Sequence, residues 1–234
     1  MKLVILAGGY GTRISEETKI KPKPLVLIGN RPIIWHLMKI YSFYGINDFI
    51  ICLGYKGHML KHELNKYKNK ENWKIKFVNT GLHTMTGGRV KRIKKYLNNE
   101  KNFCLSYGDG LSNVNIKKLI QFHLKNKKMA TLTAVKYKNP KGVLSINKNL
   151  SIKNIKEKPM EYINGGFFVL SNKIFEYLKN DKTIFEKDCL PIIAKKSQLL
   201  AFKHNGFWAC MDTLREKKEL NILWKQKICE WKIW

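Results

Sequence analysis

Several features that would assign this 234-residue chain to a class of protein are missing from its sequence. No apolar run reaches the roughly 18 residues that a membrane-spanning helix needs, and the apolar residues 3–7 are too few for the core of a signal peptide. The cysteines are odd in number, scattered and without a Cys-x-x-Cys pair, which favours free thiols in a reducing cytoplasm. They are Cys52, Cys104, Cys189, Cys210 and Cys229. His58 and His62 could share a metal ion on one helix, but no third ligand lies near them in the sequence, so we expect no metal there.

Acidic residues are also scarce, because 17 Asp and Glu stand against 45 Lys and Arg, a net charge of +28. Such a charge suggests a nucleic-acid partner, but only five of the basic residues are arginine, and the sequence has neither arginine-rich clusters nor aromatic stacking platforms. The other 40 are lysines, which together with abundant Asn and Ile fit the codon usage of an A/T-rich genome. With 44% hydrophobic and 12% aromatic residues, the chain is too apolar for a disordered basic tail. We therefore expect a folded protein with a solvated lysine surface and with neither nucleic acid nor membrane as its partner.

The pattern of apolar residues predicts strands that alternate with helices. Buried strands are expected at 2–7 and 49–53, an alternating strand at 73–79, and further strands at 102–107 and 130–135. Helices are expected at 32–44, 58–67, 89–97 and 115–125. Short β segments follow at 143–146, 151–156 and 163–170, and helices return at 183–195 and 214–224. This order predicts an α/β fold, in which a mostly parallel mixed sheet has helices on both faces and a small β-rich region is added. We predict a single domain, 1–234, with halves at about 1–136 and 137–234.

The most informative segment follows the first predicted strand. It reads Leu6-Ala7-Gly8-Gly9-Tyr10-Gly11-Thr12-Arg13, with Lys21-Pro22-Lys23-Pro24 shortly after it. Glycines let backbone N–H groups approach a ligand closely, and in such sheets ligands bind beyond the carboxyl ends of the strands. The segment is not a P-loop, because it lacks the Gly-Lys-Ser/Thr of that motif, and Ile14 stands where the dinucleotide fingerprint needs its third glycine. What remains is a glycine loop with two cations, Arg13 and Lys23, held near it.

A second informative loop follows the strand at 102–107. Asp109 lies between Gly108 and Gly110, so its carboxylate has no bulky neighbour in the sequence. Taken alone, Asp109 could be a turn residue or a ligand of Mg2+, which prefers one or two carboxylates together with phosphate oxygens and water. Both informative loops lie at the carboxyl ends of predicted strands, where ligands bind in this kind of sheet.

The order of motifs over nearly the whole chain resembles that of the sugar-1-phosphate nucleotidylyltransferases. The glycine loop with Lys-Pro-Lys-Pro is similar to the general signature of that family, while residues 84–89 and 163–168 resemble its glucose-1-phosphate cytidylyltransferase branch. Further similar stretches are 35–36, 44–49, 53–57, 107–110 and 211–215. The resemblance implies a Rossmann-like nucleotidyltransferase fold and a cytoplasmic, homo-oligomeric enzyme of polysaccharide biosynthesis. Such an enzyme uses Mg2+ to transfer CMP from CTP to a sugar 1-phosphate, here glucose 1-phosphate, and releases pyrophosphate.

The resemblance also implies roles for individual residues. The catalytic residues would be Arg13, Lys23 and Asp109, with Arg13 on the departing pyrophosphate and Lys23 near the α-phosphate. Asp109 and Asp212 would hold the Mg2+ ion. The nucleotide would be bound by Leu6, Ala7, Gly8, Gly9, Tyr10, Gly11, Thr12, Arg13, Lys23, Thr84, Arg89 and Gly108. The acceptor would be bound by Gly142, Glu157, Lys158, Asn164 and Gly165.

Three departures from the family's pattern concern the acceptor side and the assembly more than the nucleotide. The segment between residue 57 and Trp73 is short, Asn139-Pro140-Lys141-Gly142 keeps only the last glycine of the family's Gly-Arg-Phe-Gly, and the spacer after Pro159 is also short. The alternatives left open are therefore a different acceptor, such as another hexose or heptose phosphate or a non-sugar phosphate, and a different nucleotide, UTP, dTTP or GTP.

Overall fold

The first strand of the chain, β1 (Leu3–Leu6), shows why the central sheet has a hydrophobic core on each face. Successive side chains of a strand point to opposite faces. Leu3 and Ile5 pack into one cluster of buried residues, and Val4 and Leu6 pack into another. An uninterrupted apolar run is therefore what this strand needs, because helices cover both faces of the sheet.

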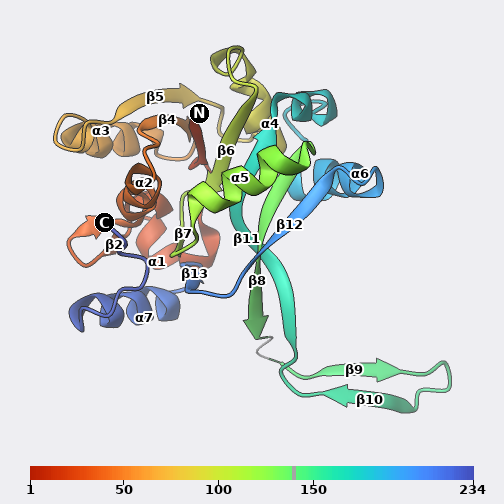
Figure 1. Ribbon diagram of the computed structural model, residues 1–234. Coiled ribbons are helices and arrows are strands. Elements are labelled where there is room, and N and C mark those ends of the chain that lie inside the picture. Colours follow the sequence, from red (N-terminus) through yellow and green to blue (C-terminus); the bar gives the residue numbers. More distant parts are fainter. Residues whose placement is uncertain (139–140) are drawn as a thin grey trace.

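The computed structural model describes residues 1–138 and 141–234 and is built around a seven-stranded sheet (Figure 1). From one edge to the other, its strands are β12 (Leu199–His204), β8 (Ala130–Lys138), β11 (Met160–Ser171), β6 (Asn102–Tyr107), β1, β4 (Asp48–Leu53) and β5 (Lys74–Asn79). Strands β6, β1, β4 and β5 are parallel, β12 is parallel to β8, and β11 is antiparallel to both of its neighbours. The predicted mostly parallel mixed sheet is confirmed.

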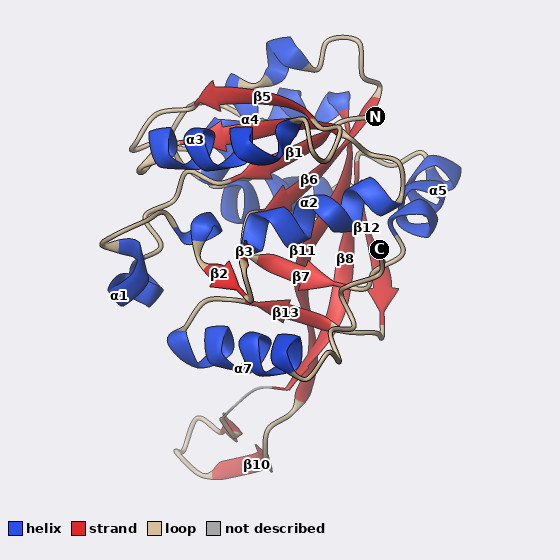
Figure 2. Cartoon of the chain, turned by 90° about the vertical axis from the view of Figure 1, so that its left-hand side faces the viewer, coloured by secondary structure: helices blue, strands red, loops and turns tan. Residues whose placement is uncertain are grey.

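Helices cover both faces of this sheet, as predicted. One cluster contains residues of α2 (Ile33–Phe43), α3 (Gly57–Lys68), α5 (Ile116–Asn126) and α7 (Leu214–Lys225), and Figure 2 shows α2 and α3 in front of the strands. The other cluster contains residues of α4 (Thr86–Arg92) and α6 (Leu190–Lys195). The remaining helical elements are short: η1 (Thr12–Ile14), α1 (Ser15–Thr18), η2 (Lys23–Leu25), η3 (Lys94–Tyr96), η4 (Asn172–Tyr177) and the π-helical turn η5 (Phe185–Cys189). None of the helices that the structure describes is long and apolar enough to cross a membrane.

In the part of the chain that the structure describes, three two-stranded ribbons accompany the main sheet. The first pairs β2 (Leu27–Ile28) with β3 (Arg31–Pro32). The second pairs β7 (Gly110–Ser112), directly after Asp109, with β13 (Trp208–Cys210) in antiparallel register. This β7–β13 ribbon carries Asp212, which follows β13, to the carboxyl end of β6.

The third ribbon is a hairpin of β9 (Val143–Ile146) and β10 (Ile152–Lys156), which projects from the body of the molecule beyond the ends of β8 and β11 (Figure 1). We call residues 143–156 the hairpin arm. In its register Leu144 lies opposite Ile155 and Ile146 opposite Ile152, so the four side chains share one face of the ribbon. They are between 49% and 60% exposed, and we call them the aliphatic face of the arm.

Differences from the predicted elements have local causes. The helix predicted at 89–97 begins three residues earlier, at Thr86, and continues as the separate turn η3. The helix predicted at 183–195 is divided into η5 and α6, and Pro191 lies in the first turn of α6, where its missing N–H costs no hydrogen bond. Asn139 and Pro140, which depart from the family's pattern, lie outside the described residues.

Candidate active site

A cavity of about 790 Å3 lies at the carboxyl ends of β1 and β6, the edge at which ligands bind in sheets of this kind. Its lining includes most of the residues that the sequence proposed for a site: Leu6, Ala7, Gly8, Gly9, Tyr10, Gly11, Arg13, Lys23, Thr84, Arg89, Gly108, Asp109, Asn164, Gly165 and Asp212. Four proposed residues, Thr12, Gly142, Glu157 and Lys158, lie outside this lining. The structure thus brings together both informative loops and a segment from near the end of the chain.

The two glycines at the start of the loop differ in what surrounds them. A Cβ on Gly8 would lie 2.3 Å from Nη1 of Arg89, so the absence of a side chain there makes room for the guanidinium. A Cβ on Gly9 would meet nothing within 4 Å, and this residue is exposed. The backbone of Gly9 is therefore accessible to a ligand, while Gly8 packs against the guanidinium of Arg89.

Farther along the loop, Gly11 has a φ of 68°, in the left-handed region that favours glycine. A Cβ there would also lie 2.8 Å from Cγ2 of Thr18 and 3.1 Å from Cβ of Lys23. The turn at Gly11 starts η1, so that Thr12 lies outside the cavity lining while Arg13 lies within it.

Arg89 holds the glycine loop in place from inside the protein. Its Nη1 donates to the carbonyl oxygens of Leu53 and Gly81 at 3.2 and 2.7 Å and to Oγ1 of Thr80 at 2.7 Å. Its Nη2 donates to the carbonyl oxygens of Gly8 at 3.0 Å and Leu82 at 3.3 Å. The side chain is only 5% exposed, and burial lowers the pKa of its guanidinium. The sequence predicted a nucleotide contact for Arg89, and the structure adds a clamp that joins strands and loops from three parts of the chain.

Two carboxylates and two cations meet beside this loop. Nζ of Lys23 donates to Oδ2 of Asp109 at 2.5 Å and to Oδ1 of Asp212 at 2.6 Å. Nη1 of Arg13 donates to the other oxygen of Asp212, also at 2.6 Å. The β7–β13 ribbon places the two acids together, and the backbone N–H of Met211 donates to the carbonyl oxygen of Asp109 at 3.0 Å.

These contacts shift the pKa values of the groups involved. Burial alone lowers the pKa of Lys23, but the carboxylates of Asp109 and Asp212 raise it by more, so its ammonium is stabilised. Burial alone raises the pKa of Asp212, but Lys23 and Arg13 lower it by more. Both groups therefore carry their charges at neutral pH.

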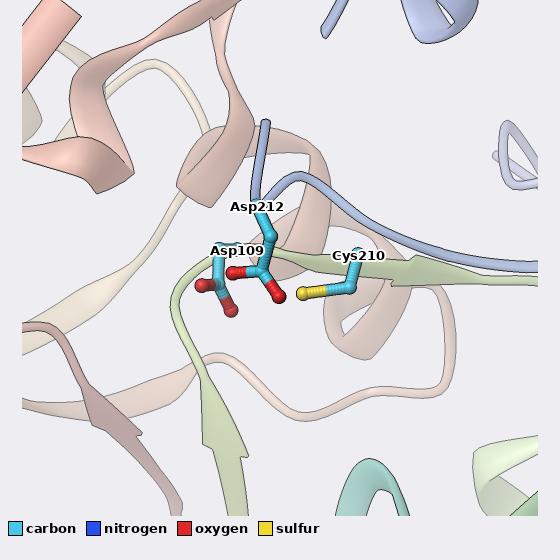
Figure 3. A group of neighbouring side chains, drawn as sticks. All are labelled: Asp109, Cys210 and Asp212. Carbon is cyan, nitrogen blue, oxygen red and sulfur yellow. The ribbon is translucent and has the colours of Figure 1, made fainter. Parts of the chain in front are cut away.

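The donor set fits a divalent cation. Ligand atoms of Asp109, Asp212 and Cys210 all lie within 4.8 Å of one another (Figure 3), and the ammonium of Lys23 already lies between the two carboxylates, so a positive charge is stable at that position. Two carboxylates and free positions for phosphate oxygens are what Mg2+ prefers. Burial and the two neighbouring carboxylates of Asp109 and Asp212 raise the pKa of the Cys210 thiol.

The far end of the cavity is lined by groups from β6, β11 and η5. Asn164 and Gly165 of β11, which the resemblance assigns to the acceptor, line this part of the cavity. Glu186, which was not predicted from the sequence, also lines the cavity; its Oε2 accepts from Oγ1 of Thr86 at 2.7 Å, and its Oε1 accepts from the hydroxyl of Tyr107. The pKa of the Tyr107 hydroxyl is raised, mainly by its burial and in addition by the neighbouring Glu186 carboxylate. In the sequence Glu186 is one acid in a helical segment, and no motif or spacing signals its position.

Three residues predicted for the acceptor lie at the base of the hairpin arm instead. Glu157 and Lys158 have side chains that are 72% and 51% exposed and make a weak ion pair of 3.9 Å with each other. A Cβ on Gly142 would lie 2.9 Å from Oε2 of Glu157, so these residues are neighbours. Their role in acceptor binding stays a prediction.

Comparison with known proteins agrees with this geometry. A family model described as nucleotidyl transferase matches residues 2–216. The chain is similar to the glucose-1-phosphate cytidylyltransferase of Salmonella typhimurium, with 44% identity over 257 aligned positions and all of both chains covered. It is 42% identical to the probable glucose-1-phosphate cytidylyltransferase of Bacillus subtilis, again over the full length of both. Among solved structures it is similar to HddC from Yersinia pseudotuberculosis, with a TM-score of 0.77, 29% identity, and 95% of this chain and 99% of that chain covered.

The family match covers most of the chain, including the glycine loop, Asp109 and Asp212, and the relatives are similar from end to end. The fold that the resemblance implied is present, with the predicted loops at one edge of the sheet. This chain belongs to the nucleotidyl transferase family.

Proposed function

We propose that this chain uses Mg2+ to transfer CMP from CTP to glucose 1-phosphate, and that it releases pyrophosphate. Its full-length similarity to glucose-1-phosphate cytidylyltransferases supports the identity of the substrates. The structural observation that carries the proposal is the meeting of Asp109, Asp212, Lys23 and Arg13 beside an open glycine loop in one cavity.

The proposed reaction asks for charge neutralisation more than for covalent work by the protein. An oxygen of the sugar phosphate attacks the α-phosphorus of CTP, a new phosphorus–oxygen bond forms, and the bond from that phosphorus to the bridging oxygen of the β-phosphate breaks. Both reactants are anions, so the site must hold them together against their repulsion. The guanidinium of Arg13 and the ammonium of Lys23 supply fixed positive charge at the end of the glycine loop. An ion of Mg2+ held by Asp109 and Asp212 would offset further charge on the phosphates.

The cavity offers different surroundings to the two substrates. The open backbone of Gly9 and the ring of Tyr10, which lies 5.2 Å from that of Tyr55, line the end that we assign to the nucleotide. Asn164 and Glu186 line the end that we assign to the sugar, because amide and carboxylate groups can bind its hydroxyls.

A panel assay tests the proposal. Purified protein is incubated with Mg2+ and with each combination of CTP, UTP, dTTP and GTP with several hexose and heptose phosphates, and pyrophosphate release is measured. We expect CTP with glucose 1-phosphate to be turned over fastest. A higher rate with another acceptor or nucleotide would establish the corresponding alternative, and no turnover in any combination would contradict the proposed function.

The substitution Asp109→Asn tests the metal site, because it removes the negative charge of the side chain and changes its shape little. Loss of one preorganised electrostatic contact costs on the order of 100-fold or more in kcat, and we expect a decrease of that size. Asp48→Asn is the matched control, because Asp48 begins β4, which is parallel to β1, and so lies at the end of the strands away from the cavity, where it should leave the rate unchanged. Equal rates for the two variants would remove Asp109 from the active site.

We also propose that the protein is cytoplasmic and assembles as a homo-oligomer. Free thiols at all five cysteines support a reducing compartment. The aliphatic face of the hairpin arm supports assembly, since an isolated two-stranded ribbon is marginally stable in water and the identical apolar face of a second copy would cover it. Light scattering on wild type and on Ile146→Lys, compared with Asn154→Lys on the other face, tests this contact: only the first substitution should lower the oligomer mass.

A further inference from the structure

Cys210 adds a sulfur atom to a site that otherwise consists of hard oxygen donors. The residue ends β13, opposite Gly110, which follows Asp109, and it precedes Asp212 by two positions. Its Sγ lies within 4.8 Å of ligand oxygens of both acids. In Figure 3 the thiol points toward the Asp212 carboxylate, with Asp109 beside it.

Two independent observations mark this position as a place for a cation. The three potential ligand atoms converge, although they come from two separate parts of the chain. In addition, the ammonium of Lys23 lies between the same two carboxylates, at 2.5 and 2.6 Å from their oxygens. The site therefore stabilises positive charge without help from a substrate.

The chemistry of sulfur then distinguishes between cations. Mg2+ binds carboxylate, phosphate and water oxygens and gains little from a thiol. Zn2+ and Cd2+ bind thiolate strongly, and three protein ligands with a remaining open position are a common arrangement for Zn2+. Binding of such an ion by sulfur forms one metal–sulfur bond and breaks the S–H bond, and the proton passes to the buffer.

We propose that Cys210 is a third protein ligand for thiophilic divalent cations, so that Zn2+ and Cd2+ bind at Asp109 and Asp212 and compete with Mg2+ there. The proposal deepens the metal site of the proposed function, and it requires that Asp109 and Asp212 lie in that site. The side chain of Lys23 must turn away from the carboxylates when the ion enters. Cys210 is then a specificity-determining residue that makes the enzyme sensitive to traces of soft metal ions.

Cadmium titration of the free protein tests the proposal without any substrate. A bond between thiolate and Cd2+ gives a charge-transfer absorption in the ultraviolet, and its growth during the titration yields a dissociation constant. We expect one Cd2+ per chain with release of one proton. Cys210→Ser should abolish the absorption and weaken Cd2+ binding by at least the 10- to 100-fold that loss of an outer-shell partner costs, while Mg2+ affinity stays unchanged.

Two further variants make the result specific. Cys229→Ser removes another partly exposed thiol, whose Sγ lies 3.3 Å from the carbonyl oxygen of Leu223, and should keep the absorption. Asp109→Asn should weaken Cd2+ binding while the thiol stays in place. A charge-transfer absorption that persists in Cys210→Ser, or Cd2+ binding that is unaffected by Asp109→Asn, would overturn the proposal. Because the readout needs no turnover, an inactive panel assay would refute the proposed function and leave this test intact.

Discussion

The clamp made by Arg89 allows a structural role to be separated from a direct role in nucleotide binding. Arg89→Lys keeps the positive charge and removes the planar fork. The guanidinium presents five donors in a fixed geometry, whereas an ammonium has three donors at one point. Lysine therefore cannot reach the carbonyl oxygens of Gly8, Leu53 and Gly81 together with Thr80 and Leu82.

The expected loss of stability follows from the hydrogen bonds. At least two of the five acceptors lose their donor, and hydrogen bonds to charged groups contribute about 1.5–3 kcal/mol each. The side chain of Arg89 is only 5% exposed, so water can replace few of the lost hydrogen bonds. We expect the free energy of unfolding to fall by about 3 kcal/mol, which lowers Tm by roughly 6–12 °C in a chain of this size. Nucleotide affinity should fall by about tenfold, because the glycine loop loses its support at Gly8.

Arg92→Lys is the control on the same helix. Arg92 pairs with Asp181 at the surface, where the two side chains are 43% and 49% exposed, and such pairs contribute about 0–1 kcal/mol. Urea unfolding of the wild type and both variants gives the stabilities, and equilibrium titration with CTP gives the affinities. Equal stabilities for Arg89→Lys and Arg92→Lys would refute the clamp. If Arg89→Lys keeps the wild-type stability but changes the relative affinities for CTP and UTP, Arg89 instead contacts the base directly.

Two other predictions concern the core and one turn. His36 is buried, its Nε2 lies 3.0 Å from the carbonyl oxygen of Ile28, and burial lowers its pKa to about 4. The unfolded chain therefore binds more protons than the folded one between about pH 6.5 and 4, and the free energy of unfolding should fall by about 3 kcal/mol as the pH falls through this range. Urea unfolding at several pH values should show that the stability of His36→Gln depends less on pH than that of the wild type. Gly29 has a φ of 62°, and a Cβ there would lie 2.1 Å from Nε1 of Trp224, so Gly29→Ala should cost about 2–5 kcal/mol from strain and overpacking. Gly45 has a φ of 81° and nothing within 4 Å of its Cβ position, so Gly45→Ala should lower the free energy of unfolding by only about 1–2 kcal/mol. Thermal unfolding of the two variants measures the difference.

The long elements of the fold could be predicted because their apolar patterns are regular. Strand β1 is a continuous apolar run, β4 is apolar after its first residue, and β6 contains the apolar stretch 103–105. Helices α2 and α5 have apolar residues at helical spacing. The ribbon of β7 and β13 could not be predicted in this way, since each strand has three residues and no period can be recognised over that length. This ribbon is nevertheless the element that brings Asp212 to Asp109, so the metal site could be inferred only from the resemblance to a family.

The candidate site was predictable where one segment supplies several of its groups. Residues 6–13 form a loop whose glycines and arginine lie together because they are neighbours in the chain. Glu186 and Cys210 were missed, because each reaches the cavity through the packing of distant segments. Arg89 was found but only part of its environment could be inferred, since its hydrogen-bond acceptors come from the glycine loop, from β4 and from residues 80–82.

Because of the hairpin arm, the rate of proteolysis should depend on whether the protein is assembled. Its strands contact each other and present their aliphatic face outward, so the arm can open locally at low free-energy cost. Lys148, Lys153 and Lys156 are exposed on it, and trypsin cleaves after lysine. In a free monomer this segment should be cut before the lysines of the sheet and its helices, dividing the chain between β8 and β11. A second copy seated on the aliphatic face would slow that cut, so the rate of the first cleavage reports how much of the protein is assembled.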